Sequence, residues 1–195
     1  MTHYYDASQP STLSQKDIPV RIGSSTYLFF SGSGVFSKDR LDNGTRALIE
    51  HAIIQGDVLD LGCGIGIVGI IAKIQHPSCQ VTLMDVNQRA LTLARRNAKR
   101  HKVDAHVIEA DATQAIPGSY DTILTNPPYT AGRDVCFSFI EHAHLSLKQA
   151  GTLQLVVRYQ KGGKVLEMRM HDIFGNVSTL ARQGGYRVLK SIKTI

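Results

Sequence analysis

Short apolar runs alternate with longer amphipathic stretches over most of this chain, and this pattern predicts its secondary structure. The apolar runs, which suit buried strands, lie near residues 57–61, 80–86, 105–111, 120–126 and 152–158. Between them, apolar positions at helical spacing lie near residues 65–75, 87–101 and 134–148. Strands and helices that alternate in this way form right-handed crossover units, so the pattern predicts an α/β fold around a largely parallel sheet.

The N-terminal part of the chain departs from this alternation. Residues 1–17 are polar, and we expect them to be extended. Residues 21–30 predict a small hairpin around Gly23-Ser24-Ser25. Asp42 is a suitable cap for a helix over residues 42–54, which would lead into the first strand of the main sheet.

The C-terminal part predicts a helix and a second hairpin. The helix is expected over residues 164–174, and the paired strands over 176–182 and 186–193. The chain has 195 residues, of which 43% are hydrophobic, and this is enough for one domain with a substantial core. We therefore expect a single domain over residues 1–195, with an extension over 1–40 and a core over 41–195.

Charge and cysteine content narrow the class of protein. The formal net charge is +6 and the isoelectric point is about 9.3, which favours a polyanionic partner such as RNA. Cys63, Cys79 and Cys136 lack the spacing of a metal site, and the chain has no long apolar span. We therefore expect no metal, no membrane segment and a reducing, cytoplasmic setting. The sequence carries no signal for a particular oligomeric state.

The stretch Asn126-Pro127-Pro128-Tyr129 follows an apolar run and should lie at the end of a strand. Asn126 and Pro127 both precede a proline, which disfavours helical backbone and keeps the segment extended. Because prolines have no N–H, we expect the carbonyls of Asn126 and Pro127 and the Asn126 amide oxygen to be free acceptors. With the ring of Tyr129, such a corner suits a planar NH2 group. The alternative is a proline turn without chemistry.

A second motif has the form D-x-G-x-G-x-G and begins at Asp60. Gly62, Gly64 and Gly66 follow a predicted strand and let the backbone turn sharply and approach a ligand. The dinucleotide-binding pattern G-x-G-x-x-G would need glycine at position 67, which is Ile67, so a dinucleotide fold is disfavoured. Asp60 would repel a pyrophosphate, but it can bind a cationic amine or hold the loop.

Two more acids, Asp85 and Asp111, follow the next two predicted strands. Parallel strands end at one edge of a sheet, so we expect Asp60, Asp85 and Asp111 to line one crevice, with Asp85 placed to accept from ribose hydroxyls. Each acid by itself is more often a helix cap or a turn residue. Together with the glycine loop and the Asn126 corner, they favour a binding site.

These motifs, in this order, resemble those of class I S-adenosylmethionine-dependent methyltransferases. Gly34-Val35-Phe36-Ser37 and Leu41-Asp42-Asn43-Gly44-Thr45 resemble the cofactor-covering segment of the methyltransferase small family, which includes the RsmC-like ribosomal RNA guanine-N2 methyltransferases. Residues 185–190 resemble that family's final strand, and the resemblance spans roughly residues 3–195. Bacterial RsmC enzymes carry two such domains in tandem, whereas this chain has one and resembles single-domain members found in archaea.

The resemblance implies a Rossmann-like fold with a seven-stranded, mostly parallel sheet, an antiparallel last strand and helices on both faces. It implies S-adenosyl-L-methionine as the cofactor and a ribosomal or transfer RNA as the partner, with guanine N2 as the favoured target. The implied cofactor-binding residues are Phe36, Asp42, Gly44, Asp60, Gly62, Cys63, Gly64, Gly66, Asp85, Val86, Asp111, Ala112 and Asn126. The implied catalytic residues are Asn126, Pro127 and Tyr129. The implied substrate-binding residues are Asn126, Pro128, Tyr129, Arg158, Lys161 and Lys164.

Other functions remain open. A protein glutamine N5-methyltransferase would offer its amide to the same corner, although such enzymes usually carry an extra helical domain. A non-catalytic cofactor-binding module that assists RNA processing has no need for that corner. A pyrimidine-C5 enzyme needs a cysteine where Asn126 stands and is disfavoured. For RNA contact, the basic loop over residues 158–169 is favoured over the basic helix near residues 89–102, which we expect to be a solvated face.

Overall fold

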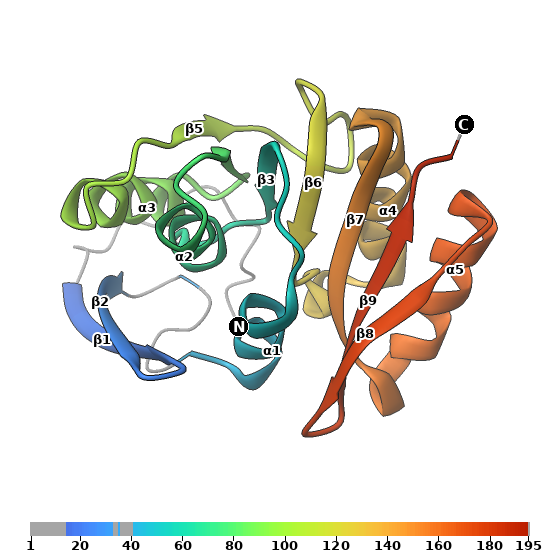
Figure 1. Ribbon diagram of the computed structural model, residues 1–195, viewed down its shortest axis with the longest axis horizontal. Coiled ribbons are helices and arrows are strands. Elements are labelled where there is room, and N and C mark those ends of the chain that lie inside the picture. Colours follow the sequence, from blue (N-terminus) through green and yellow to red (C-terminus); the bar gives the residue numbers. More distant parts are fainter. Residues whose placement is uncertain (1–14, 33–34, 36–40, 195) are drawn as a thin grey trace.

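The computed structural model describes residues 15–32, 35 and 41–194, which form a seven-stranded sheet, a two-stranded sheet and the helices around them (Figure 1). The large sheet consists of β3 (Asp57–Leu61), β4 (Gln80–Asp85), β5 (His106–Glu109), β6 (Tyr120–Thr125), β7 (Leu147–Arg158), β8 (Ser178–Gln183) and β9 (Tyr186–Ile192). The small sheet pairs β1 (Gln15–Ile22) with β2 (Ser25–Gly32). The helices are α1 (Asn43–His51), α2 (Ile67–Gln75), α3 (Gln88–Arg100), α4 (Arg133–Ser146) and α5 (Lys164–Phe174), with short helical turns at Tyr129–Ala131 and Tyr159–Gly163.

The strands of the large sheet lie in the order β5-β4-β3-β6-β7-β9-β8. The strands β3 to β7 are parallel, and β9 runs antiparallel to both β7 and β8. The predicted seven-stranded, mostly parallel sheet with an antiparallel last strand is therefore confirmed. The chain moves outward from β3 through β5 and then returns to β6 on the other side of β3. In open α/β sheets, a ligand crevice forms at such a switch point.

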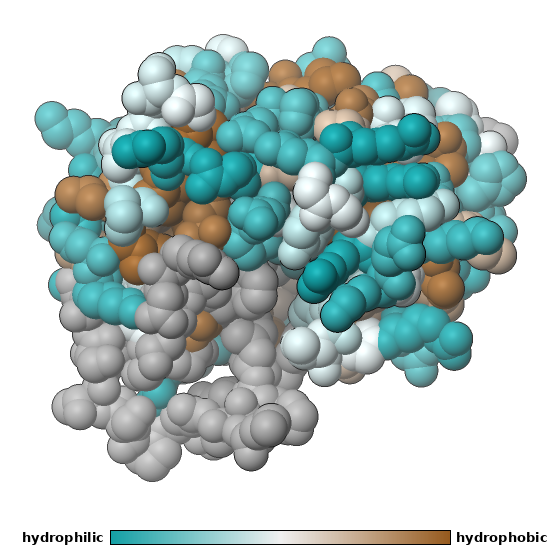
Figure 2. Space-filling view, turned by 90° about the horizontal axis from the view of Figure 1, so that it is seen from below, coloured by the Kyte–Doolittle hydropathy of each residue, from teal (hydrophilic) through white to brown (hydrophobic). Residues whose placement is uncertain are grey.

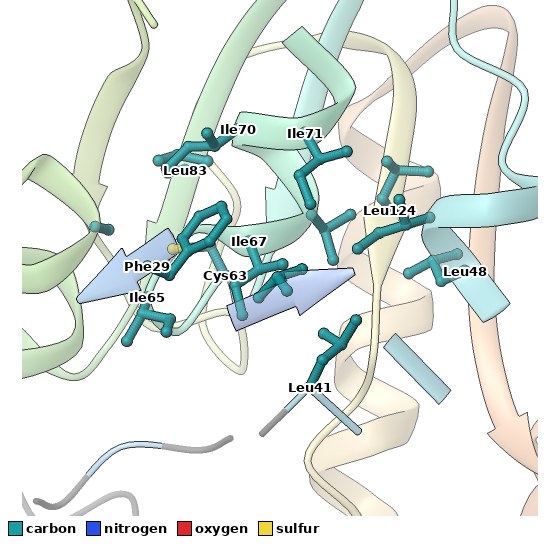
Figure 3. Close-up of a cluster of buried hydrophobic side chains, with 14 of the residues drawn as sticks. Phe29, Leu41, Leu48, Cys63, Ile65, Ile67, Ile70, Ile71, Leu83 and Leu124 are labelled. Atoms are coloured by element: carbon teal, nitrogen blue, oxygen red, sulfur yellow. The ribbon is translucent and has the colours of Figure 1, made fainter. Parts of the chain in front are cut away.

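Helices cover both faces of the sheet, as predicted. One hydrophobic core joins α1, α2, α3 and the small sheet to one face, and a second core joins α4 and α5 to the other. Side chains alternate along β6 accordingly, with Leu124 in the first core and Ile123 in the second. Figure 3 shows the first core, in which Phe29 of β2 lies near Cys63 and Ile65 of the glycine loop.

Two predicted boundaries shift because of contacts between distant elements. The helix α1 ends at His51 rather than near residue 54, where the side chain of Gln154 on β7 binds both backbone groups of Ile53. The Ile53 N–H donates to Gln154 Oε1 at 2.8 Å, and Gln154 Nε2 donates to the Ile53 carbonyl at 2.7 Å. The strand β7 begins at Leu147 rather than near residue 152, because Leu147 already pairs with Tyr120 across an irregular register.

The N-terminal hairpin is longer than predicted and is fixed to the body of the protein by Asn97. Its pairing runs from Gln15 opposite Gly32 to the turn at residues 23–24, and residues 1–14 lie outside the described part of the chain. Asn97 Oδ1 accepts from the Phe30 N–H at 2.7 Å, and Asn97 Nδ2 donates to the carbonyls of Phe30 and Ile65, each at 3.0 Å. This fully buried side chain of α3 therefore joins β2 to the glycine loop.

The basic surface of α3 is only in part the solvated face that we expected: Arg95 and Lys99 are exposed, but other basic side chains contact the hairpin. The guanidinium of Arg100 lies 4.2 Å from the centre of the Phe30 ring and forms an ion pair with Asp17 at 2.7 Å. The guanidinium of Arg96 lies 5.0 Å from the same ring, and His101 Nε2 donates to the Leu28 carbonyl at 2.9 Å. These long side chains cover the hairpin with their stems and planar groups, which is a common use of arginine.

Candidate functional site

A cavity of about 320 Å³ lies at the carboxyl edge of the parallel strands. Its walls come from the segments that follow β3, β4, β5, β6 and β7 and from the N-terminus of α1. Figure 2 shows the molecule from this end, and hydrophilic side chains crowd the right half of the face, on the side of β8 and α5. The predicted residues that line the cavity are Asp42, Asp60, Gly62, Cys63, Gly64, Asp85, Val86, Ala112, Asn126, Pro127, Pro128, Tyr129, Arg158 and Lys161.

The glycine loop between β3 and α2 turns back on itself below the cavity. Gly62, Gly64 and Gly66 all have left-handed backbone, with φ values of 69°, 55° and 84°. The N–H groups of Gly62 and Cys63 both donate to the Met84 carbonyl at 2.9 Å, which ties the loop to the end of β4. A Cβ on Gly62 would lie 3.3 Å from the Phe139 ring, so glycine allows this ring to pack directly against the loop backbone.

Asp60 is a buried acid on the cavity wall, with 2% of its surface exposed. Its Oδ2 accepts from the Gly69 N–H at 2.8 Å, so it holds the first turns of α2 against β3. The pKa of Asp60 is raised to about 7, mainly because burial disfavours the charged form; the Gly69 bond lowers this pKa and the neighbouring charge of Asp85 raises it. A cation in the cavity would stabilise the ionised carboxylate.

Asp85 also holds the glycine loop. Its Oδ2 accepts from the Gly64 N–H at 2.8 Å, and its Oδ1 accepts from the Asn87 N–H at 2.9 Å. The residue is 3% exposed and lines the cavity. The carboxylate expected to meet a ribose therefore binds at least two backbone groups of the protein itself.

Asn126 contacts the N-terminus of α1 with one end of its amide. Its Nδ2 donates to Thr45 Oγ1 at 3.0 Å and lies 3.5 Å from Asp42 Oδ1. Asp42 in turn caps α1, because its Oδ1 accepts from the N–H groups of Gly44 and Thr45 at 2.9 and 3.0 Å, and its Oδ2 accepts from the Thr45 hydroxyl. No donor among the described residues binds Asn126 Oδ1, which is left as an acceptor beside the cavity.

The carbonyl of Pro127 is less free than we expected. It accepts from the Tyr129 N–H at 2.9 Å, and the Pro128 carbonyl accepts from the Ala131 N–H at 2.9 Å. These bonds close the helical turn at Tyr129–Ala131 directly after the motif. The Asn126 side-chain oxygen is therefore the better placed of the predicted acceptors.

Aromatic side chains from three elements meet at the cavity: Tyr129, Phe139 of α4 and Tyr186 of β9. The Tyr129 hydroxyl is buried without a hydrogen-bond partner among the described residues, and burial raises the pKa of this phenol. Neither Phe139, Tyr186 nor Thr45 was predicted as a site residue. Only Thr45 had a local signal, because it follows Asp42 in the capping segment.

Four of the predicted residues that the structure describes do not line the cavity. A Cβ on Gly44 would lie 2.9 Å from Tyr186, and a Cβ on Gly66 would lie 3.0 Å from Ile70, so both glycines serve packing. Asp111 Oδ1 accepts from the N–H and hydroxyl of Thr113 at 2.8 and 2.7 Å and stabilises its own turn. Lys164 is exposed at the first position of α5. Phe36 lies outside the described residues.

Within residues 15–32, 35 and 41–194, no three His, Cys, Asp or Glu side chains converge as metal ligands. In the same part of the chain, no helix is long and apolar enough to cross a membrane.

Comparisons with known proteins identify similar sequences and structures. Residues 26–190 match the family described as "Methyltransferase small domain". The uncharacterized protein YbxB of Bacillus subtilis is 30% identical over 200 residues, which cover 99% of this chain and 100% of that protein. The ribosomal RNA small subunit methyltransferase C of Actinobacillus succinogenes is 38% identical over 165 residues, which cover 82% of this chain.

Among solved structures, the T. thermophilus 16S rRNA N2 G1207 methyltransferase RsmC, in complex with AdoMet and guanosine, superimposes with a TM-score of 0.77 at 23% identity. The match covers 96% of this chain and 52% of that one. The match to the Actinobacillus protein likewise covers 49% of its length, so this chain spans about half the length of these relatives.

Proposed function

This chain belongs to the methyltransferase small domain family, and from this premise we propose that it methylates an exocyclic amine in RNA with S-adenosylmethionine as donor. The favoured target is N2 of a guanine in ribosomal RNA, with transfer RNA as a second possible substrate. The observation that carries the proposal is the orientation of Asn126, whose NH2 group is bound at α1 while its oxygen stays free beside the cavity.

The residues of the cavity fit S-adenosylmethionine. Its sulfonium supplies an activated methyl group, so the protein needs no strong base to activate the donor. Burial is the main cause of the raised pKa of Asp60, about 7, and the cationic groups of the cofactor would stabilise its ionised form. Asp85 would bind the ribose hydroxyls, and the apolar side chains of Met84, Val86 and Ala112 would bind the adenine.

Asn126 would act on the amine that receives the methyl group. The lone pair of an exocyclic purine amine is delocalised into the ring, which makes this nitrogen a poor nucleophile. An N–H bond accepted by Asn126 Oδ1, and a second accepted by the remaining lone pair of the Pro127 carbonyl, would favour a pyramidal nitrogen and stabilise the positive charge that develops on it. The remaining task is to align the amine with the methyl group.

The target base would have to leave its stack to reach this corner. Tyr129 and Tyr186 supply aromatic surface on the cavity wall for such a base. Arg158 and Lys161 lie on the same wall, and neither forms an ion pair with any other described residue. Together with Lys164 on α5, they are suited to bind the phosphates that flank the base.

The Asn126→Ala variant tests the chemical role of the corner. We expect methyl transfer to fall about a hundredfold or more, because one aligned acceptor in a closed site is worth about 3 kcal/mol in the transition state. The affinity for S-adenosylmethionine, measured by calorimetry, should stay largely unchanged. The readout is single-turnover transfer from labelled cofactor into RNA, followed by nucleoside analysis.

Three results would contradict the proposal in different ways. Near-normal transfer by Asn126→Ala would refute the role of Asn126. A methyl group on a ring nitrogen, a carbon atom or a ribose would refute the amine as target. Transfer to glutamine side chains of a protein but not to RNA would favour the protein N5-methyltransferase, and cofactor binding without transfer to either would favour a non-catalytic module.

A further inference from the structure

Thr45 connects the N-terminal cap of α1 to the loop that carries Asn126. Its hydroxyl donates to Asp42 Oδ2 and accepts from Asn126 Nδ2, so a single side chain bridges residues that are 84 positions apart. Thr45 is 6% exposed, and its Oγ1 lies 3.0 Å from Asn126 Nδ2. By contrast, Asp42 Oδ1 lies 3.5 Å from the same nitrogen, which makes Thr45 the main partner of the Asn126 amide.

The direction of each bond in this chain follows from its neighbour. The carboxylate of Asp42 can only accept, so the single hydroxyl proton of Thr45 is directed to it. Thr45 Oγ1 can then only accept from Asn126, and the end of the amide that faces it must be the NH2 group. The oxygen of Asn126 is left at the opposite end, where no described residue binds it.

We propose that Thr45 is a positioning residue that fixes the orientation of the Asn126 amide, so that Asn126 Oδ1 is held ready for an amine of the substrate. The chemical use of that oxygen rests on the function proposed above. The orientation itself is a property of the free protein. Without the Thr45 hydroxyl, the Asn126 NH2 group would keep only the long contact with Asp42 Oδ1, and the amide could more readily rotate and present this donor to an amine that needs an acceptor.

The bond can be removed with little effect on the helix. In Thr45→Val the backbone N–H of residue 45 keeps its bond to Asp42 Oδ1, and the Gly44 N–H keeps its own, so the cap of α1 remains. Valine preserves the shape of threonine and removes only the hydroxyl. Thr45→Ser keeps the hydroxyl, and Thr92→Val is a control, because the Thr92 hydroxyl bonds within α3 to the Gln88 carbonyl, away from the cavity.

The first measurement does not depend on activity. The side-chain amide of Asn126 is assigned in a 15N NMR spectrum by its absence from Asn126→Ala, and its heteronuclear NOE is recorded in each variant. We expect a rigid amide, with values close to those of the backbone, in the wild type, Thr45→Ser and Thr92→Val. In Thr45→Val the NOE should fall clearly, to values typical of mobile side chains.

The second measurement is the kinetics of methyl transfer to RNA. We expect kcat to fall at least about tenfold in Thr45→Val, because a misoriented acceptor is lost from the transition state. The KM for S-adenosylmethionine should change less than about twofold, and Thr45→Ser should recover most of the rate. A general loss of structure would instead lower the melting temperature and change both constants.

The outcomes separate this inference from the proposed function. A rigid Asn126 amide in Thr45→Val would overturn the inference whatever the activity of the protein. A normal kcat in Thr45→Val, beside an active wild type, would overturn it as well. If the wild type methylates no amine, the proposed function fails, while the NMR result still decides whether Thr45 orients Asn126.

Discussion

At the residue scale, Asp60 shows how a binding site costs stability. The acid has a pKa of about 7 in the folded protein against 3.8 as its ordinary value, so the folded state binds a proton that the unfolded state has lost. The stability associated with this group is therefore fully present below pH 4 and is lost as the pH rises toward 7. Above that pH, the folded protein holds an anion that its surroundings do not compensate.

We predict that Asp60→Asn is more stable than the wild type at pH 8. The amide keeps an acceptor for the Gly69 N–H but carries no charge, so the gain should be roughly 2–4 kcal/mol at pH 8 and close to zero at pH 4. Urea unfolding of both proteins from pH 4 to pH 8 measures the difference. A stability gap that does not widen with pH would contradict the raised pKa.

The residues of the site were predictable where a short motif carries them. Asp60 and Asn126 stand close to glycines or prolines whose backbone restrictions are visible in the sequence, and Asp85 ends an apolar run that predicts a strand. Tyr186 was missed because it comes to the cavity through contacts between segments far apart in the chain, which no local pattern encodes. Thr45 follows Asp42 in the capping segment, but its contact with Asn126 is likewise between distant segments. Asp111 was assigned from its place after a strand, but its carboxylate stabilises its own turn.

At the scale of elements, the hairpin of β1 and β2 depends on Asn97. A second contact between α3 and the hairpin, the ion pair of Arg100 and Asp17, is partly exposed to solvent. Exposed ion pairs contribute little to stability, whereas a buried amide that binds three backbone groups contributes much more.

We predict that Asn97→Ala lowers the free energy of unfolding by about 3 kcal/mol, because it leaves backbone groups of Phe30 and Ile65 unpaired in the core. Arg100→Ala should have a much smaller effect and serves as the matched control. Denaturant unfolding gives the free energies, and hydrogen exchange at the Phe30 amide shows whether the hairpin opens. Equal effects of the two substitutions would refute the role assigned to Asn97.

The elements themselves were largely predictable, and their ends were less so. Turn residues and apolar periodicity are local, which explains why the strands and helices lie near the predicted positions. The end of α1 is set by Gln154 and the start of β7 by Tyr120, and both contacts come from other elements. The basic face of α3 is solvated at Arg95 and Lys99, as expected, but nothing in its own segment predicts that Phe30 and Asp17 lie against Arg100.

At the scale of the whole molecule, the distribution of charge matters more than the net value of +6. Arg158 and Lys161 line the cavity and Lys164 follows at the start of α5, whereas part of the basic surface of α3 is engaged by the hairpin. The group of Arg158, Lys161 and Lys164 is therefore the better candidate site for a polyanion.

We predict that replacing Lys161 and Lys164 by glutamine weakens RNA binding and flattens its salt dependence. Each lost phosphate contact should lower the slope of log affinity against log salt by about one unit. The matched control replaces Lys99 and Lys102, two exposed lysines on and just after α3, and should leave the slope nearly unchanged. Titrations at several salt concentrations measure the slopes. RNA affinity that is insensitive to salt in the wild type would instead favour a protein substrate.

The general architecture could be predicted from the sequence because a repeated alternation of strands and helices has few solutions. The antiparallel last strand was implied by the family resemblance. No periodicity indicates that β9 enters between β7 and β8, where it runs antiparallel to both.

The position of β9 also bears on the order in which the last strands can join the sheet. The segment of β8 leaves the ribosome before that of β9, yet it joins the sheet only through β9. The two strands can form a local hairpin first, since their two-residue turn, Gly184-Gly185, has the positive φ angles of 55° and 82° that tight turns of this kind require. Such a hairpin would dock on β7 as a unit. Because Tyr186, the first residue of β9, lines the cavity, the cavity is complete only once β9 has joined the sheet.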